Sequence, residues 1–387
     1  MTVALATFWG SLALVAYTYL GFPALVLARG LLRPRGYRSG GGTPRVSMVI
    51  AARNEAGSIG AKIENLLALD YDEGRLEVIV VSDGSTDGTG EIAAARGGPA
   101  VRVLDLGRVG KAAALNAGVA ASTGDILVFS DANSVYAPDA LRALVRPFAD
   151  PDVGGVAGDQ RYRVDVDGRY ADGIVAGERG YWALDRLLKS LQSRGGNAIS
   201  ATGAIYAIRR ELFEPIPDGV TDDFFTSTGV IARGKRLVFA ADAVAYEPPA
   251  PSGSREFDRK VRVITRGLRA VGARRELLDA RRHGFYALQL FSHKILRRLM
   301  IVPLATLAVA SAALAAAGHP WYQAAAAAQG MFYGCAALGL ARGSQLKVLK
   351  LPAYFCLVNA ACARAVWNIV RGRRIDRWEP ARAGAQP

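Results

Sequence analysis

Two long segments without a charged side chain restrict the folds open to this sequence more than any other feature. The first extends from Val3 to Ala28 and the second from Leu299 to Ala341. A helix needs about 20 apolar residues to cross a bilayer, so each segment is long enough to span one. Basic residues follow the first segment directly, and positive charge favours the cytoplasmic side. We therefore expect an integral protein of the cytoplasmic membrane, with the first helix ending inside the cell.

The second segment divides into two expected spans. The sequence AGHPWYQ at 317–323 contains Gly and Pro, which break helices, so we predict spans at about 299–317 and 321–341 joined by a short outer turn. The apolar stretch 351–370 is also long enough to span, but a span there would carry the basic C-terminal tail outside. A helix at the membrane surface, or one that re-enters it, would keep the tail inside, and both alternatives stay open.

The residues between these segments have the pattern of a soluble domain. Apolar runs that suit buried strands occur at 45–52, 76–83, 101–106 and 125–133, and a stretch with helical spacing follows each of them. Strands that alternate with helices form a mostly parallel sheet covered on both faces. The expected fold is therefore an α/β domain inserted between transmembrane helices. The expected boundaries are 1–43 for the N-terminal helix and linker, 44–254 for the cytoplasmic domain, 255–298 for amphipathic interfacial helices, 299–341 for two spans, and 342–387 for a last apolar or interfacial segment with a basic tail.

Polar residues gather where the expected strands end, at the sheet edge where ligands bind in such folds. Arg53 follows the first strand and Asp83 ends the second. Asp131 and Asn133 come at the end of the fourth. A carboxylate and an amide oxygen two residues apart can face one point and suit Mg²⁺ or Mn²⁺. Because such an ion takes phosphate oxygens as further ligands, a diphosphate is the expected guest, with Lys111 at a helix start as another phosphate contact.

Composition and missing motifs exclude several kinds of site. The chain has three His and three Cys residues without the spacing of a zinc site. Neither a G-x-G-x-x-G after the first strand nor a P-loop occurs.

The net charge of +14 comes largely from 255–298, where 13 Lys and Arg residues stand against four Asp and Glu. Since this segment has apolar residues at helical spacing and precedes a span, we expect an amphipathic helix on membrane lipid, and no nucleic acid as a partner.

Six short motifs resemble those of the membrane-embedded family 2 glycosyltransferases, which have a GT-A fold and include the synthases of cellulose, hyaluronan and poly-N-acetylglucosamine. The resemblance covers about residues 45–270. Each motif is weak alone, and their order along the chain carries the resemblance. The motifs are VIAARNEAGSI (49–59), VVSDGSTDGT (80–89), GKAAALNAG (110–118), VFSDANS (128–134), SATGAIYAIRRELF (200–213) and TDDF (221–224).

The resemblance implies an inverting hexosyltransferase. It would move a sugar from a nucleotide diphosphate, expected to be UDP, to a lipid-linked or polysaccharide acceptor at the inner membrane face. Asp223 matches the family's general base, and Asp131 with Asn133 matches the site of the Mg²⁺ or Mn²⁺ ion. The implied donor-binding residues are Ala51, Arg53, Glu55, Asp83, Lys111, Asp131 and Arg266. The implied acceptor-binding residues are Thr202, Gly203 and Asp222.

Two departures from the family pattern affect these expectations. Asn133 stands where the metal motif has a second Asp, so either it ligates through its oxygen or Asp131 holds the ion alone. Within 259–270, Val263 and Gly267 replace the Gln and Trp of the processive synthases, so the sequence does not support processive synthesis. A catalytically degenerate nucleotide-sugar-binding subunit of a membrane glycan-assembly complex is the alternative. A transporter is disfavoured, because neither long uncharged segment offers a charge to line a pathway.

Overall fold

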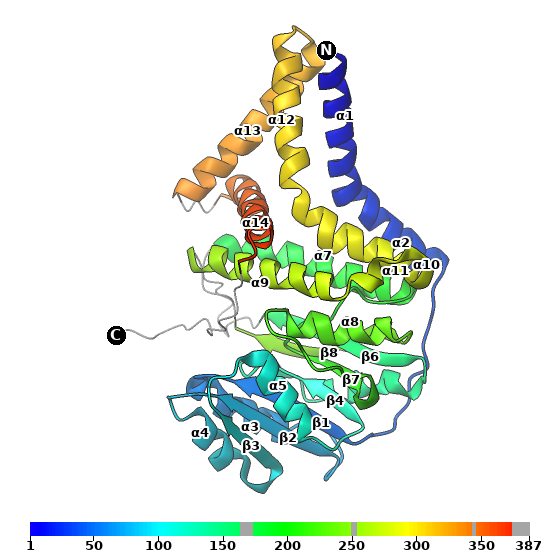
Figure 1. Cartoon of the computed structure of the whole chain (residues 1–387), viewed down its shortest axis with the longest axis vertical. Coiled ribbons are helices and arrows are strands. Elements are labelled where there is room, and N and C mark those ends of the chain that lie inside the picture. Colours follow the sequence, from blue (N-terminus) through cyan, green and yellow to red (C-terminus); the bar gives the residue numbers. More distant parts are fainter. Residues whose placement is uncertain (163–172, 249–253, 343–345, 374–387) are drawn as a thin grey trace.

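An eight-stranded sheet forms the centre of the computed structural model, which describes residues 1–162, 173–248, 254–342 and 346–373 (Figure 1). Its strand order is β3-β2-β1-β4-β7-β6-β8-β5. The first four of these strands are parallel, and β7 joins β4 in the antiparallel direction. The α/β fold is therefore confirmed, with a sheet that becomes mixed beyond β4. The strands are β1 (Val46–Ala52), β2 (Leu76–Asp83), β3 (Val101–Leu106), β4 (Ile126–Phe129), β5 (Val135–Tyr136), β6 (Val153–Tyr162), β7 (Tyr206–Arg209) and β8 (Arg236–Glu247).

Helices cover both faces of this sheet. They are α3 (Ala56–Leu67), α4 (Thr89–Gly97), α5 (Lys111–Ala120), α6 (Ala140–Val145), α7 (Gly173–Gly195) and α8 (Asp222–Ala232). β1 is buried along its whole length, and its side chains alternate between two apolar cores. Met48 and Ile50 share the first core with α3 and α6, whereas Val49 and Ala51 share the second with α5 and α8. Burial on both faces explains why this strand is apolar throughout.

The fourth strand ends earlier than the sequence predicts. β4 stops at Phe129, and the chain then turns through the residues of the metal motif. The hydroxyl of Ser134 donates to the carbonyl oxygen of Asp131 at 2.9 Å, and the backbone nitrogen of Ser134 lies 3.4 Å from the same oxygen. Serine side chains compete with strand pairing in this way. The turn therefore lifts Asp131 out of the sheet at its carboxyl edge.

Apolar helices extend from one side of the domain (Figure 1). Within the described residues, three helices are long and apolar enough to cross a membrane, at 2–32, 320–342 and 348–370. The first combines α1 (Thr2–Ala16), a π-helical turn (Tyr17–Gly21) and α2 (Phe22–Leu32), and the others correspond to α13 (Pro320–Arg342) and α14 (Lys347–Val370). Whether α14 spans or lies at the surface stays a prediction. The tail from residue 374 onward lies outside the described residues.

The helix expected at 299–317 differs from its prediction. It forms α12 (Ile301–Ala316), which passes the length requirement only together with the segment Phe285–Leu299, from which it is bent by 53°. Pro303 stands in its first turn and has no N–H to donate to the carbonyl of Leu299. The helix therefore cannot continue straight through this point. α12 packs along α1, where the hydroxyls of Ser11 and Thr306 lie 2.8 Å apart.

Two helices lie between the sheet and the apolar helices, α7 and α9 (Ser254–Ala273) (Figure 1). α7 packs Leu188 and Leu191 against Phe22 and Val26 of α2. On α9, the ammonium of Lys260 lies 3.3 Å from the hydroxyl of Tyr354 in α14. The segment predicted as amphipathic therefore begins with a long helix in contact with the apolar part, and its position at a lipid surface stays a prediction.

Candidate active site

Asp83 is buried at the carboxyl end of β2. It has no exposed surface, and its Oδ1 accepts hydrogen bonds from the backbone nitrogens of Val109 at 2.7 Å and Gly110 at 2.9 Å. Its Oδ2 has no partner within the described part of the chain. Leaving a buried carboxylate oxygen unpaired is costly. This atom therefore suits a hydrogen-bond donor that a ligand supplies, such as a base N–H or a ribose hydroxyl.

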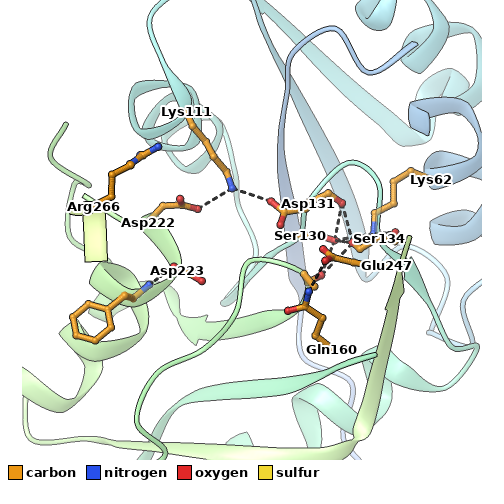
Figure 2. Close-up of polar contacts among 12 residues, drawn as sticks. Lys62, Lys111, Ser130, Asp131, Ser134, Gln160, Asp222, Asp223, Glu247 and Arg266 are labelled. Atoms are coloured by element: carbon orange, nitrogen blue, oxygen red, sulfur yellow. Dashed lines mark hydrogen bonds and ion pairs between the residues drawn. The ribbon is translucent and has the colours of Figure 1, made fainter. Parts of the chain in front are cut away.

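A lysine joins two carboxylates that lie far apart in the sequence (Figure 2). The ammonium of Lys111, in the first turn of α5, lies 2.8 Å from Asp131 Oδ1 and 3.1 Å from Asp222 Oδ2. Burial by itself would lower the pKa of Lys111, but the attraction of Asp131 and Asp222 outweighs burial and raises it. Lys111 is therefore a fixed positive charge between the turn after β4 and the start of α8.

Asp222 and Asp223 occupy the first turn of α8, where the helix dipole favours negative charge. Asp222 is 8% exposed and turns toward Lys111, whereas Asp223 is half-buried and accepts a hydrogen bond from the nitrogen of Phe224 at 2.6 Å. Burial and the neighbouring Asp222 raise the pKa of Asp223 to about 6. A carboxylate with such a pKa can accept a proton near neutral pH, as a general base must.

Asp131 offers a suitable position for a divalent ion. Its side chain is 33% exposed, and a Cβ atom placed on Gly203 would lie only 2.7 Å from its Oδ2, so a glycine is required there. Asn133 is exposed two residues further along the same turn. No group of three His, Cys, Asp or Glu side chains that could hold a metal occurs in the described ranges. This donor set fits Mg²⁺ or Mn²⁺ bound through few protein oxygens, with phosphate and water completing the shell.

The other predicted site residues lie around this point with different local roles. Ala51 is a buried member of β1, and Arg53 is half-buried just beyond that strand. Glu55 is the residue directly before α3, and its carboxylate accepts a hydrogen bond from the hydroxyl of Ser58 at 2.7 Å. The hydroxyl of Thr202 is buried without a partner in the described structure. Thr202 therefore has hydrogen-bonding capacity for a ligand, and Glu55 is also explained by its structural role.

Arg266 is placed differently from the expectation of a donor contact. Its guanidinium on α9 donates to the carbonyl oxygen of Val220, from Nε at 3.1 Å and from Nη2 at 2.7 Å. Val220 comes just before Thr221, the residue that precedes α8. Arg266 therefore anchors the start of the helix that carries Asp222 and Asp223, and its contact with a donor stays a prediction.

Two polar residues near Asp131 were missed by the sequence argument (Figure 2). Glu247 ends β8, and its carboxylate accepts a hydrogen bond from the side chain of Gln160 in β6. Burial, with repulsion from Asp131, raises the pKa of Glu247 to about 7. Glu247 stands at the end of an apolar stretch and directly before Pro248, which is a signal for a strand end. Because no strand was predicted at 236–247, this part of the sheet edge had no predicted site residue.

Comparisons with known proteins agree with this geometry. The family model described as Glycosyl transferase family 2 matches residues 47–216. The solved structure of the mannosyltransferase PcManGT from Pyrobaculum calidifontis, in complex with GDP-Man and Mn²⁺, superposes with a TM-score of 0.71 at 25% identity. The match covers 94% of this chain and 99% of that chain. The similarity extends through the apolar helices as well as the sheet, since it includes almost the whole chain.

Curated relatives match over shorter stretches. A beta-monoglucosyldiacylglycerol synthase of Nostoc sp. (strain PCC 7120 / SAG 25.82 / UTEX 2576) is 35% identical over 156 residues, 38% of this chain and 33% of the relative. A poly-beta-1,6-N-acetyl-D-glucosamine synthase of Staphylococcus aureus (strain MSSA476) is 28% identical over 210 residues, 52% of this chain and 49% of the relative. The chain thus spans a third to a half of these two relatives. Residues 47–216 therefore match a family 2 glycosyltransferase domain, and the fold is of the GT-A type.

Proposed function

We propose that this chain is a membrane-bound inverting glycosyltransferase that moves a hexose from a nucleotide diphosphate to an acceptor hydroxyl. The observation that carries the proposal is the Lys111 bridge, which brings Asp131 and Asp222 together with Asp223 beside them. These residues come from three separate segments of the chain. One side of the arrangement suits a diphosphate and the other suits an acceptor, as a single displacement at the anomeric carbon requires.

Each residue then has a distinct task. Asp223 takes the proton of the acceptor hydroxyl while the hydroxyl oxygen bonds to the anomeric carbon and the bond from that carbon to the diphosphate breaks. Lys111 offers a positive charge to the leaving phosphates, and Asp83 accepts a hydrogen bond from the nucleoside. A divalent ion held by Asp131, with Asn133 beside it, would neutralise the charge that develops on the diphosphate. The base contributes typically 10²–10⁴ in rate.

The nucleotide of the donor and the chemical nature of the acceptor are further parts of this proposal. The motifs favour a uridine-linked sugar, whereas the solved structure with 25% identity holds GDP-Man, so both nucleotides need testing. For the acceptor we propose a lipid-linked sugar or a polysaccharide end at the inner membrane face. The supporting observation is that α7 and α9 lie between the sheet and the apolar helices (Figure 1). We also propose that residues 44–254 are cytoplasmic, with basic residues after α2 and α13 on that side.

The direct test is release of UDP or GDP by the purified full chain in lipid nanodiscs, with a panel of UDP- and GDP-linked sugars, membrane lipid extract as acceptor, and Mn²⁺ or Mg²⁺. We expect metal-dependent release with at least one donor and a loss of about 10²–10⁴ in Asp223→Asn. The matched control is Asp218→Asn, which changes an exposed carboxylate in the loop before α8. Nucleotide binding without turnover on any donor would support the degenerate binding subunit instead. Unchanged turnover in Asp223→Asn would exclude Asp223 as the base.

A further inference from the structure

A buried lysine reaches the turn that carries the proposed metal ligand (Figure 2). Lys62 of α3 is 1% exposed, and its ammonium donates to Ser130 Oγ at 2.7 Å, to the carbonyl of Ser134 at 2.7 Å and to Ser134 Oγ at 3.2 Å. It also lies 4.1 Å from the ring centroid of Tyr136. Ser130 and Ser134 are the two ends of the turn that contains Asp131. Lys62 therefore binds both ends of this turn at once.

A lysine at position 62 costs folding free energy that an apolar side chain filling the same space would not cost. Its hydrogen-bond partners in the described structure are neutral oxygens, and burial lowers its pKa to about 7. A buried ammonium without a directly bonded carboxylate is costly, and an apolar side chain of similar length would avoid the cost. The carboxylates that attract it through space are Asp131 and Glu247. The position thus calls for an explanation in terms of the site.

The two serines extend the contacts of Lys62 to the facing segment. The hydroxyls of Ser130 and Ser134 lie 2.9 Å apart, and each is within reach of the carbonyl of Ala204, at 3.1 and 3.2 Å. Ala204 follows Gly203, which approaches Asp131 so closely that a Cβ atom there would meet its carboxylate. Hydrogen bonds that start from a charged donor are stronger and polarise the next bond. Lys62 therefore fixes the turn and the segment against which Asp131 rests.

We propose that Lys62 is a positioning residue for the metal-binding carboxylate: by holding both ends of the Ser130–Ser134 turn, it directs Asp131 toward the ion. The inference rests on the proposed function in one respect, namely that a divalent ion binds to Asp131. Residues that orient metal ligands typically change metal affinity or activity by about 10–100-fold when they are replaced. The effect should therefore appear in binding of the ion itself, without any turnover.

The experiment measures Mn²⁺ binding to the full chain in nanodiscs by the loss of the EPR signal of free Mn²⁺, alone and with UDP or GDP. We expect Lys62→Met to raise the dissociation constant of Mn²⁺ about tenfold or more. Asn65→Ala is the matched control, because Asn65 lies on the same helix and exchanges two hydrogen bonds with the backbone of Tyr136, at 2.8 and 2.9 Å, just beyond the turn. It should lower the melting temperature but change Mn²⁺ affinity less than about twofold.

The outcomes separate positioning from general stability. Mn²⁺ affinity in Lys62→Met equal to that of the unchanged chain, or an equal loss in Asn65→Ala, would overturn the inference, as would failure of the unchanged chain to bind Mn²⁺. If Lys62→Met does not fold, Ser134→Ala keeps the lysine and one end of the turn, and we expect a smaller loss in the same direction. No loss in that variant would again contradict the inference. Mn²⁺ binding that depends on Lys62 in a chain that transfers no sugar would reject the proposed function alone.

Discussion

At the scale of single residues, Asp223 determines how the proposed activity depends on pH. Its pKa is raised to about 6 by burial and by the adjacent Asp222. A base must be ionised in the free enzyme, so kcat/KM should fall as the pH drops below about 6 and level off above about 7. We expect this acidic limb in a pH profile of nucleotide release by the full chain. A limb near the ordinary pKa of aspartate, about 4, would contradict the assignment.

The Lys111 bridge makes a second prediction at this scale, about stability. In Lys111→Met, Asp131 and Asp222 would share a site without the cation between them, and the pKa of Asp223 in the folded state, which the charge of Lys111 lowers, would rise above about 6. Groups with a raised folded pKa stabilise at low pH and lose that contribution as the pH rises through the folded value. Lys111→Met should therefore be destabilised at pH 7.5 by about 2–3 kcal/mol, less than for a fully buried pair because Asp131 is 33% exposed, and by less at pH 5.

The measurement is thermal unfolding of both proteins in detergent at the two pH values, with EDTA present so that no metal replaces the lost cation. Lys235→Met serves as control, because Lys235 is half-buried and donates only to the backbone carbonyl of Pro151, at 3.0 Å, among the contacts of the described residues. It should shift the melting temperature equally at both pH values. A destabilisation of Lys111→Met that is the same at pH 5 and 7.5 would show that loss of Lys111 does not raise the pKa of Asp223.

At the scale of elements, the parallel half of the sheet was predictable from the sequence and the mixed half was not. The expected strands 76–83 and 101–106 coincide with β2 and β3, because both are rich in Val and Leu and lie between turns. β6 contains Gly154, Gly155 and Gly158, which lower strand propensity. The structure explains two of them, since a Cβ on Gly154 would lie 2.5 Å from Leu212 and one on Gly158 would lie 2.7 Å from the carbonyl of Ala243. Such close packing cannot be read from residue types.

In the candidate site, too, the residues on predictable strands could be placed from the sequence, and those held by contacts between distant elements could not. Asp83 and Asp131 follow predictable strands, so their place at one sheet edge was predictable. Lys62 lies on a predictable helix, but a lysine among apolar positions ordinarily indicates the solvent face, and only the Ser130–Ser134 turn shows why it is buried. Arg266 occupies the position of the family motif, yet its contact with Val220 depends on where α9 crosses α8, which local sequence does not encode.

Arg266 therefore allows a prediction about how one helix positions another. In Arg266→Met the two hydrogen bonds to Val220 are lost, and the first turn of α8 with Asp223 should become less ordered. We expect kcat to fall about tenfold, the equivalent of one to two hydrogen bonds, with the dissociation constant of UDP or GDP unchanged. Calorimetric titration of the nucleotide and steady-state kinetics on the same preparation check both parts. A weaker nucleotide affinity with unchanged kcat would restore the role as a donor contact.

At the scale of the whole molecule, the helices α7 and α9 connect the catalytic domain to the apolar part. Each has contacts on both sides. In α7, Ser193 Oγ accepts from the nitrogen of Phe239 in β8 at 2.9 Å, and the carbonyl of Gly195 accepts from Arg29 of α2 at 3.0 Å. On α9, Arg266 donates to Val220, and the ammonium of Lys260 lies 3.3 Å from the hydroxyl of Tyr354 in α14. The N-terminal helix is thus hydrogen-bonded to the end of α7, which precedes Thr202 and Gly203, the residues we propose for acceptor binding.

In the proposed membrane topology, the arrangement of α14 decides on which side the C-terminal tail lies. α14 contacts α9 through Tyr354 and Lys260 and packs against α13. Arg371 and Arg373 follow it, with further basic residues in the sequence beyond, so the positive-inside rule favours a tail in the cytoplasm. Because α13 ends at Arg342, a basic residue expected inside, α14 must then begin and end on the same side. We predict that α14 does not cross the membrane.

Cysteine labelling in cells tests this topology. The three native cysteines are replaced by alanine, and single cysteines are introduced as Asp218→Cys in the catalytic domain, His319→Cys between α12 and α13, and Arg373→Cys after α14; all three positions are exposed. A membrane-impermeant maleimide should label His319→Cys in intact cells, and Asp218→Cys only after permeabilisation. If α14 stays on the inner side, Arg373→Cys behaves like Asp218→Cys. Labelling of Arg373→Cys in intact cells would mean that α14 spans, because a crossing helix carries its C-terminal end to the outer side.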